Sequence, residues 1–181
     1  MVSSPDASIE NLLNQKYANN PRVLFVPRPQ AYAQLNVGLI ETVQDILQHE
    51  RLQSNTFSTF VVLAIEYPFV RATTIDDAIN TLFLFESDSL ISVRPDSSLF
   101  FQHQGHGMQP ILNQEKFTKL EREALYKYSG GISVTRLGIF DKHQKVISGT
   151  VGHFIVDQNT SLGIFSEYDL QLAKLIIEVD I

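Results

Sequence analysis

The sequence contains no cysteine, and this and other absences exclude several classes of function. Without cysteine there can be no disulfide, no thiolate metal site and no cysteine nucleophile. The chain has 14 Lys and Arg against 20 Asp and Glu and no basic run, which argues against nucleic-acid binding, because such binding depends on clustered cations. We see no signal peptide and no apolar run of about 18 residues, so we expect a soluble cytoplasmic protein without membrane contact.

The size and composition of the chain are typical of one globular domain. Its 181 residues are 44% apolar and 19% charged, with glycine and proline at ordinary levels. Domains of about 100 to 200 residues with this balance can bury a substantial core. We therefore expect a single domain over residues 1–181.

The stretch from Phe60 to Val93 predicts a β-loop-α-β unit. Two short apolar runs, Thr59 to Leu63 and Ser89 to Val93, are separated by the length of a helix, so two parallel strands are expected. Thr74 is the expected N-cap of the helix between them. Ligands collect at the carboxyl ends of strands in open α/β sheets, so the loop after Leu63 is the first place to expect a site.

The rest of the chain extends this pattern to an α/β sandwich. We expect no strand before the first helix, and we expect residues 140–148 to form a turn region. The other predicted elements are a helix after Ser4 reaching Tyr17, a strand from Val23 to Val26, a helix from Val37 to His49, a strand from Leu99 to Gln102, a helix from Gln114 to Tyr126, strands from Ile132 to Thr135 and from Val151 to Val156, and a helix begun by Ser166 with Asp169.

Five landmarks occur in the order and at the spacings of one enzyme family. They are Val2 to Pro5 (VSSP), Phe25 to Pro29 (FVPRP), Leu63 to Phe69 (LAIEYPF) with Asp88 to Val93 (DSLISV), Tyr126 to Thr135 (YKYSGGISVT) and Gly163 to Asp169 (GIFSEYD). The family has V-S-T-D, F-x-R-P, L-Q-P-T-S-P with D-S-V-x-S-V, Y-x-x-N-G-A-x-Y and D-x-D-S-E-x-D at these places. Over nearly its whole length the chain thus resembles the acylneuraminate cytidylyltransferases, the CMP-sialic acid synthetases.

This resemblance implies a fold, a reaction and a partner. The fold would be a three-layer α/β/α sandwich of the nucleotide-diphospho-sugar transferase type, with a protruding dimerisation arm at about residues 97–128. The alternative for this segment is a hairpin folded onto its own core. Family members transfer CMP from CTP to an acidic sugar and use Mg²⁺, and a homodimer is expected.

The chain departs from the family where nucleotide and metal would bind. It has no loop rich in Gly, Arg and Lys behind an N-terminal strand, the element that would aim N–H groups at a triphosphate. Gly163 and Phe165 replace the two metal-holding acids, and neither offers an oxygen to Mg²⁺. Ala64, Tyr67 and Ser129 replace a Gln, a Ser and an Asn. The leading hypothesis is a degenerate or truncated cytidylyltransferase, inactive alone and without a bound cofactor. One alternative is a working enzyme whose nucleotide loop lies elsewhere. The other is a non-catalytic subunit that binds an acidic sugar or assembles with an active paralogue.

Several residues are candidates for binding the acidic sugar. Arg71 would hold a carboxylate through its planar guanidinium, or else is a solvated arginine at a helix start. Tyr126 and Tyr128 would stack on the sugar, or else belong to the core or its rim. Ser129 and Gly130 follow from the resemblance. Arg28 and Lys127 invite the same hypothesis as Arg71.

Other polar residues are weaker candidates. Glu66 is the single carboxylate in the loop after Leu63 and would act as a base. His103 and His106 suggest a metal pair, but no third ligand is near them in the sequence. Asp169 is better explained as a helix-capping residue than as a catalyst.

Overall fold

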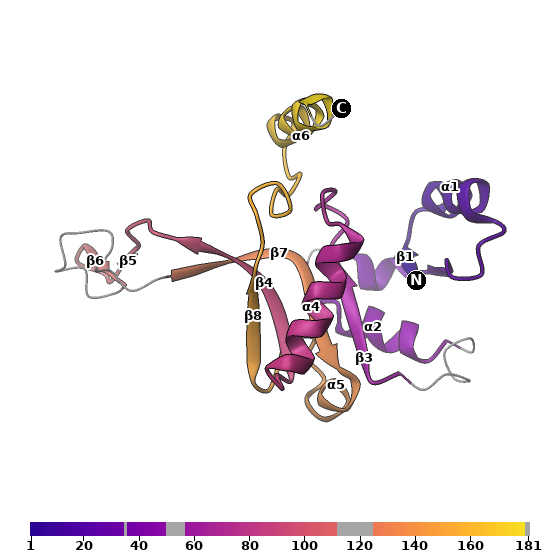
Figure 1. The fold of residues 1–181 in the computed structure, drawn as a ribbon, viewed down its shortest axis with the longest axis horizontal. Helices are drawn as coiled ribbons and strands as arrows, with labels where there is room; N and C mark the ends of the chain where they lie inside the picture. Colours follow the sequence, from indigo (N-terminus) through magenta and orange to yellow (C-terminus); the bar gives the residue numbers. More distant parts are fainter. Residues whose placement is uncertain (35, 50–56, 112–124, 180–181) are drawn as a thin grey trace.

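The computed structural model describes residues 1–34, 36–49, 57–111 and 125–179 (Figure 1). Its elements, in chain order, are β1 (Val2–Ser4), α1 (Ala7–Tyr17), β2 (Phe25–Pro27), the 3-10 helix η1 (Gln30–Ala33), α2 (Ile40–Leu47), β3 (Thr59–Leu63), α4 (Ala72–Leu84), β4 (Ser89–Asp96), β5 (Phe101–His103), β6 (Met108–Pro110), β7 (Leu125–Arg136), α5 (Leu137–His143), β8 (Val151–Ile155) and α6 (Glu167–Val179).

The main sheet has the strand order β3-β7-β4-β8. β7 is antiparallel to both β3 and β4, and β4 is parallel to β8. β3, β4 and β8 therefore point in one direction, as expected for β3 and β4. The sequence did not predict that β7 lies between β3 and β4. β7 begins some 30 residues after the end of β4, and the local apolar pattern does not show which strands it pairs with. The carboxyl ends of β3, β4 and β8 share one edge of the sheet.

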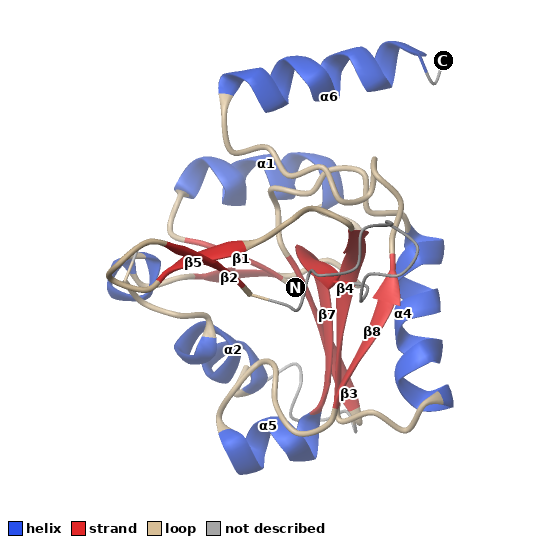
Figure 2. Cartoon of the chain, turned by 90° about the vertical axis from the view of Figure 1, so that its left-hand side faces the viewer, coloured by secondary structure: helices blue, strands red, loops and turns tan. Residues whose placement is uncertain are grey.

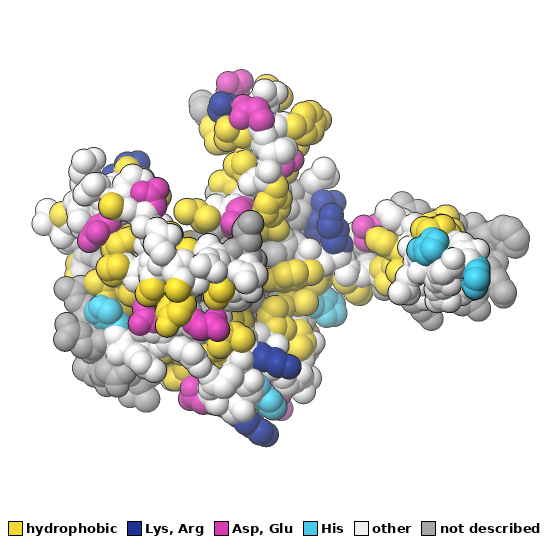
Figure 3. Space-filling view, turned by 180° about the vertical axis from the view of Figure 1, so that it is seen from behind, with side chains coloured by type: hydrophobic (Ala, Val, Ile, Leu, Met, Phe, Trp, Pro, Cys, Tyr) yellow, Lys and Arg dark blue, Asp and Glu magenta, His cyan; other side chains and the backbone are white. Residues whose placement is uncertain are grey.

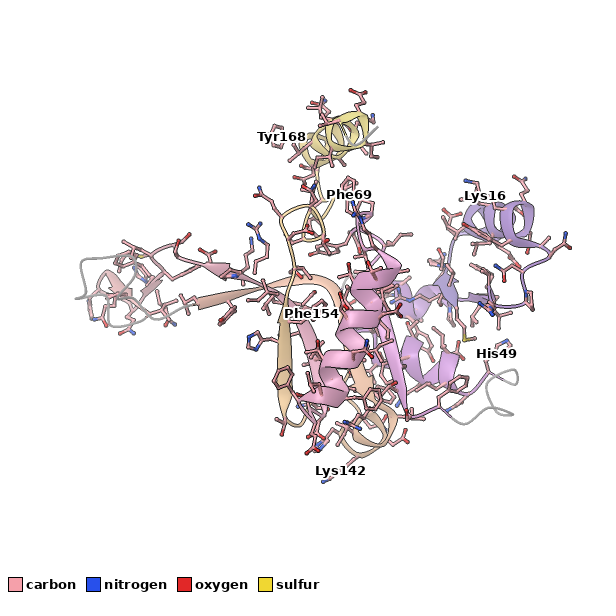
Figure 4. The ribbon with its side chains drawn as sticks, viewed as in Figure 1. Lys16, His49, Phe69, Lys142, Phe154 and Tyr168 are labelled. Carbon is pink, nitrogen blue, oxygen red and sulfur yellow. The ribbon has the colours of Figure 1, made fainter. Side chains whose placement is uncertain are left out.

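Helices cover both faces of this sheet, so the predicted layered α/β class is confirmed (Figure 2). α4 packs on one face, where Leu90, Ile132 and Val134 form a core with Ala78 and Leu82 of the helix. Figure 4 shows Phe154 of β8 beside α4, where it packs against this core. On the opposite face, Phe140 of α5 meets Phe60 of β3 edge to face at 5.3 Å. Apolar residues on both faces explain why the strands resemble continuous apolar runs.

The prediction for the N-cap of α4 was wrong by three residues. The helix begins at Ala72, with Arg71 in an extended conformation at the N-cap and no side-chain cap. Thr74 lies inside the first turn. A threonine before an apolar stripe is typical of a cap, but here the register of the apolar face against the sheet sets where the helix starts.

The N-terminal segment differs from the prediction in two ways. Val2–Ser4 is a strand, β1, which pairs in parallel with β2, so the expectation of no strand before the first helix was wrong. The cap of α1 is Asp6, whose carboxylate accepts a hydrogen bond from the Ser8 N–H at 2.8 Å, and Ser4 belongs to the strand. A three-residue strand is too short to show an alternating pattern.

A helix replaces the predicted turn after β7. Leu137–His143 forms α5, which ends at Gln144 in the left-handed region with φ of 51°. A helix of seven residues is too short to show an apolar period, and burial of Phe140 holds it in place. The helix expected at Gln114 to Tyr126 lies largely outside the described residues. Its last residue, Tyr126, belongs to β7.

An arm projects from the sheet, as the resemblance predicted. β4 and β7 pair beyond the body up to Asp96 and Leu125, and β5 and β6 form a hairpin at the end (Figure 1). The apolar residues there are exposed, among them Phe101 at 47% and Met108 at 62%. From behind, the hairpin stands apart from the body and carries apolar and histidine side chains (Figure 3). In the described part of this segment the hairpin does not fold back onto the body, and a role of the arm in dimerisation stays a prediction.

The last helix, α6, stands clear of the sheet (Figures 1 and 2). Its start agrees with the prediction, because Ser166 Oγ accepts from the Asp169 N–H and the Asp169 carboxylate accepts from Ser166 Oγ and the Phe165 N–H. Within the described residues, no helix is both long and apolar enough to cross a bilayer.

Candidate functional site

Two loops meet at the carboxyl edge of the sheet. One follows β3 and leads through Glu66 and Tyr67 to α4, and the other follows β8 and leads to α6. The Ile164 N–H donates to the Glu66 carbonyl at 2.9 Å and ties the loops together. This is where strand direction predicted a site, and two of the segments that differ from the family motifs, residues 63–69 and 163–169, reach it.

The Tyr67 side chain lies against the glycine pair of β7. A Cβ on Gly130 would stand 2.4 Å from the Tyr67 hydroxyl oxygen, and a Cβ on Gly131 would stand 3.2 Å from the tyrosine Cγ. Gly130 also has φ of 81°, which side chains rarely adopt. The glycines thus make room for the tyrosine ring, above all Gly130, where an added Cβ would collide with the hydroxyl.

Phe165, in the second loop, contacts the same tyrosine with a side chain that is 73% exposed. Its ring meets Tyr67 edge to face at 5.9 Å. A Cβ on Gly163 would come within 2.4 Å of the Phe165 ring and 3.1 Å of Tyr67. An aspartate at position 163 would therefore collide with the aromatic pair. Gly163 and Phe165 depend on each other, because the glycine leaves room for the phenylalanine ring.

Burial changes the acidity of the tyrosines at this site. The pKa of Tyr67 is raised by burial, by nearby Tyr128 and by the negative charge of Glu66. Burial also raises the pKa of Tyr128. Both phenols therefore stay protonated at neutral pH and can donate hydrogen bonds, and neither is suited to act as a base.

Ser129, next to Gly130 in β7, is buried. Its hydroxyl donates to the Ser92 carbonyl at 3.0 Å and lies 2.5 Å from Ser92 Oγ, which in turn accepts from the Ile132 N–H. The serine pair bridges β4 and β7 at the register shift between Ile91 and Val93. Its role as a sugar ligand stays a prediction, although its hydroxyl already has internal partners.

Tyr126 and Tyr128 lie further out on β7, and each is 47% exposed. The Tyr126 ring lies 4.7 Å from the ring of His153 on β8. Of the predicted residues, Tyr128 and Gly130 lie near Tyr67, while Tyr126 joins a separate aromatic contact at the base of the arm. Stacking of either tyrosine on a sugar stays a prediction.

Arg71 lies at the start of α4 and is exposed. Its charge acts on Asp157 in the second loop. Hydrogen bonds from the Thr160 backbone chiefly lower the pKa of that carboxyl, and the Arg71 guanidinium lowers it further. A carboxylate ligand would compete with Asp157 for this guanidinium.

The weaker candidates are scattered. Glu66 is exposed beside Tyr67, and Lys127 lies across from Arg94 in the arm. Arg28 donates to the Tyr32 carbonyl near β2. His103 and His106 belong to the distant hairpin. Among the described residues, no three His, Cys, Asp or Glu side chains lie close enough together to hold a metal ion.

The sequence patterns did not identify Tyr67 and Asp157 as residues of the candidate site. Tyr67 was noted only as the replacement of a serine. The signal was present as a glycine pair in an otherwise buried strand, which often marks a close approach. The partner of that approach is 63 residues away, and no local pattern connects them.

The fold is similar to that of two solved cytidylyltransferase structures. The chain resembles the structure of 4-diphosphocytidyl-2C-methyl-D-erythritol synthase from Anaerococcus prevotii with a TM-score of 0.66 and 10% identity, covering 98% of this chain and 80% of that one. It resembles 2-C-methyl-D-erythritol 4-phosphate cytidylyltransferase from Thermus thermophilus with a TM-score of 0.53 and 12% identity, covering 94% and 89%. No protein-family model and no curated protein sequence matches the chain.

At such low identity the likeness establishes the fold and leaves the substrate open. The predicted α/β sandwich of the nucleotide-diphospho-sugar transferase type is confirmed. Neither structure is of a sialic acid enzyme, so the finer resemblance rests on the sequence motifs alone.

Proposed function

We propose that the chain is a degenerate domain of the cytidylyltransferase type, which does not itself transfer CMP from CTP to a sialic-acid-like sugar. One observation carries this proposal. Tyr67 lies between the two strand-end loops, against Gly130, Gly131 and Gly163, and the exposed ring of Phe165 meets it edge to face. Nucleotidyl transfer needs positioned charges and metal ions around the phosphates, and two aromatic rings supply neither.

The test is an assay of pyrophosphate release. The purified chain is incubated with CTP, Mg²⁺ and N-acetylneuraminic acid, and phosphate is measured after addition of inorganic pyrophosphatase. We expect no release above that of a sample without protein. Release at an ordinary enzymatic rate, on the order of 1 per second or faster, contradicts the proposal.

A second candidate function is recognition of an acidic sugar without nucleotide chemistry. It is favoured by Arg71, an exposed guanidinium beside the tyrosine-lined edge of the sheet, which suits a carboxylate. Calorimetry with N-acetylneuraminic acid and with CTP separates the two candidates. Sugar binding without CTP binding supports recognition, and the absence of both leaves a role in assembly.

A matched pair of variants tests whether the arginine binds the sugar. Arg71→Lys keeps the charge but loses the planar donor pair, so it weakens sugar binding about tenfold if contact is bidentate. Arg22→Lys changes an equally exposed arginine far from the site and leaves binding unchanged. Equal effects of the two variants contradict the assignment.

We also propose that the arm supports a homodimer; the same surface would serve to pair the chain with an active paralogue. The exposed Phe101 and Met108 of the hairpin support this proposal, because apolar side chains on a projecting element are costly in water. Sedimentation velocity tests it: Phe101→Asp yields monomers, whereas Leu84→Asp, an exposed site on α4, does not. A monomeric parent chain contradicts it.

A further inference from the structure

One edge of the main sheet is unpaired within the described residues. β3 bonds on one side to β7: the Ala64 N–H donates to the Gly131 carbonyl and the Leu137 N–H to the Ser58 carbonyl. In an antiparallel ladder these bonds recur at every second residue. The N–H and C=O groups of Thr59, Val61 and Leu63 therefore point to the other edge. Among the described residues, none of them has a backbone partner.

The N-terminal sheet also has a free edge. The Val2 N–H and the Ser4 carbonyl bond to the chain around β2, so the backbone groups of Ser3 point away from β2. Figure 1 places β1 and β2 on the side of the main sheet that ends in β3, away from β8. The two sheets are not joined by a ladder.

Unpaired polar atoms collect in the same part of the chain. Among the described residues, the buried side-chain atoms without a hydrogen-bond partner are Ser3 Oγ, Arg28 Nε and Thr42 Oγ1. All three belong to the N-terminal elements β1, β2 and α2 or their flanks. Native proteins leave few such atoms unpaired, because each costs free energy. Buried polar side-chain atoms in and beside β1, β2 and α2 therefore lack hydrogen-bond partners, whereas the other described buried polar side-chain atoms have them.

From these observations we propose that the free edge of β3 binds an extended segment of another polypeptide, which adds a strand to the main sheet. A row of donors and acceptors at alternate residues matches an extended peptide and no compact ligand. The five residues of β3 extend over about 16 Å, the length of a strand of five residues.

The surroundings of β3 also define the chemistry of the segment. Phe60 packs on Phe140 on one face, and Val61 packs against the α4 core on the other. A neighbouring strand would meet apolar surface on both faces, so an uncharged segment rich in β-branched residues is expected. A second copy of the chain fits less well, because its own β1, β2 and α2 would enter the same side of the sheet.

Amide hydrogen exchange on the isolated chain is the first part of the test. We expect the amides of Thr59, Val61 and Leu63 to exchange at least about a hundredfold faster than those of Phe60, Val62 and Ala64, which face β7. Slow exchange of the first group at every protein concentration shows that the edge is already paired within the chain. Protection that grows with protein concentration shows that a second copy occupies it. Either result overturns the proposal.

The second part uses a defined probe, the peptide acetyl-Lys-Val-Ile-Val-Thr-Val-Lys-amide. We expect it to bind and to slow exchange at Val61 at least tenfold, while the same peptide with its central amides N-methylated does not bind. Val61→Pro removes the central outward N–H and leaves the ladder to β7 intact, so it weakens binding at least tenfold. Val61→Ala keeps the N–H and is the matched control.

The peptide comparison does not depend on the folding of any variant. Failure of the peptide to bind, or equal binding of its N-methylated form, overturns the proposal even if Val61→Pro is unfolded. Neither result bears on pyrophosphate release, so the proposed function stands or falls separately.

Discussion

The contact between Tyr67 and Gly130 leads to a prediction about the stability of the chain. The backbone conformation of Gly130 alone would not give this prediction. Gly130→Ala should destabilise the chain in two ways. A residue other than glycine at φ of 81° costs about 1–3 kcal/mol in backbone strain. The new methyl group would also stand 2.4 Å from the Tyr67 hydroxyl, and such overpacking costs about 1–3 kcal/mol more.

A double-mutant cycle separates these two contributions. In a Tyr67→Ala background the collision is absent and only the backbone strain remains, so Gly130→Ala should cost about 1–3 kcal/mol there and about 2–6 kcal/mol in the parent chain. The difference, about 1–3 kcal/mol, is the coupling energy of the pair.

Urea unfolding followed by far-ultraviolet circular dichroism measures all four proteins. Gly138→Ala is the control, because nothing lies near its added methyl group and it lies in α5, where alanine is favoured. It should leave stability unchanged or raise it. A coupling energy within about 0.5 kcal/mol of zero shows that Tyr67 does not lie against Gly130 in solution, and the argument for a filled site then fails.

Three further predictions concern the core, the buried serines and the last helix. Leu90→Ala, at a fully buried position, should lower the free energy of unfolding by about 2–5 kcal/mol, whereas Leu84→Ala, at a side chain 77% exposed, should change it little; equal effects in urea unfolding contradict the packing of α4 on the sheet. Ser92→Ala should cost more than Ser129→Ala, within about 1–3 kcal/mol, because Ser92 Oγ also accepts from the Ile132 N–H; the reverse order in the same assay contradicts this network. The pKa of Asp169 is lowered by its hydrogen bonds with Ser166 and with the Phe165 N–H, so the carboxylate stabilises the start of α6 above about pH 4, and this contribution is lost as the pH falls through the lowered value. An NMR titration should show a midpoint below that of an unfolded aspartate, and Asp169→Asn should remove the effect; a midpoint at or above the ordinary value contradicts it.

The predicted homodimer, the acidic sugar and the cytoplasmic location stay predictions. The suggestion that His103 and His106 form a metal pair finds no third ligand among the described residues. Arg71 lies at the start of α4 and Tyr126, Tyr128, Ser129 and Gly130 lie on β7, and only some of them lie together.

The sequence by itself determined the fold class and the position of the site. Apolar periods predicted β3, α4 and β4, and the cap at Ser166 and Asp169 predicted the start of α6, because these signals act within a few residues. Strand direction then placed the loop after Leu63 at the carboxyl edge of the sheet.

Only the tertiary structure decided what fills that site. The insertion of β7 between β3 and β4 brings Gly130 and Gly131 under Tyr67, and the loop after β8 brings Gly163 and Phe165 beside it. These contacts join residues that are 63 to 98 positions apart from Tyr67, and they depend on strand order, which no local pattern encodes. The short elements β1 and α5 were missed for the same reason, since pairing and burial, rather than periodicity, stabilise them.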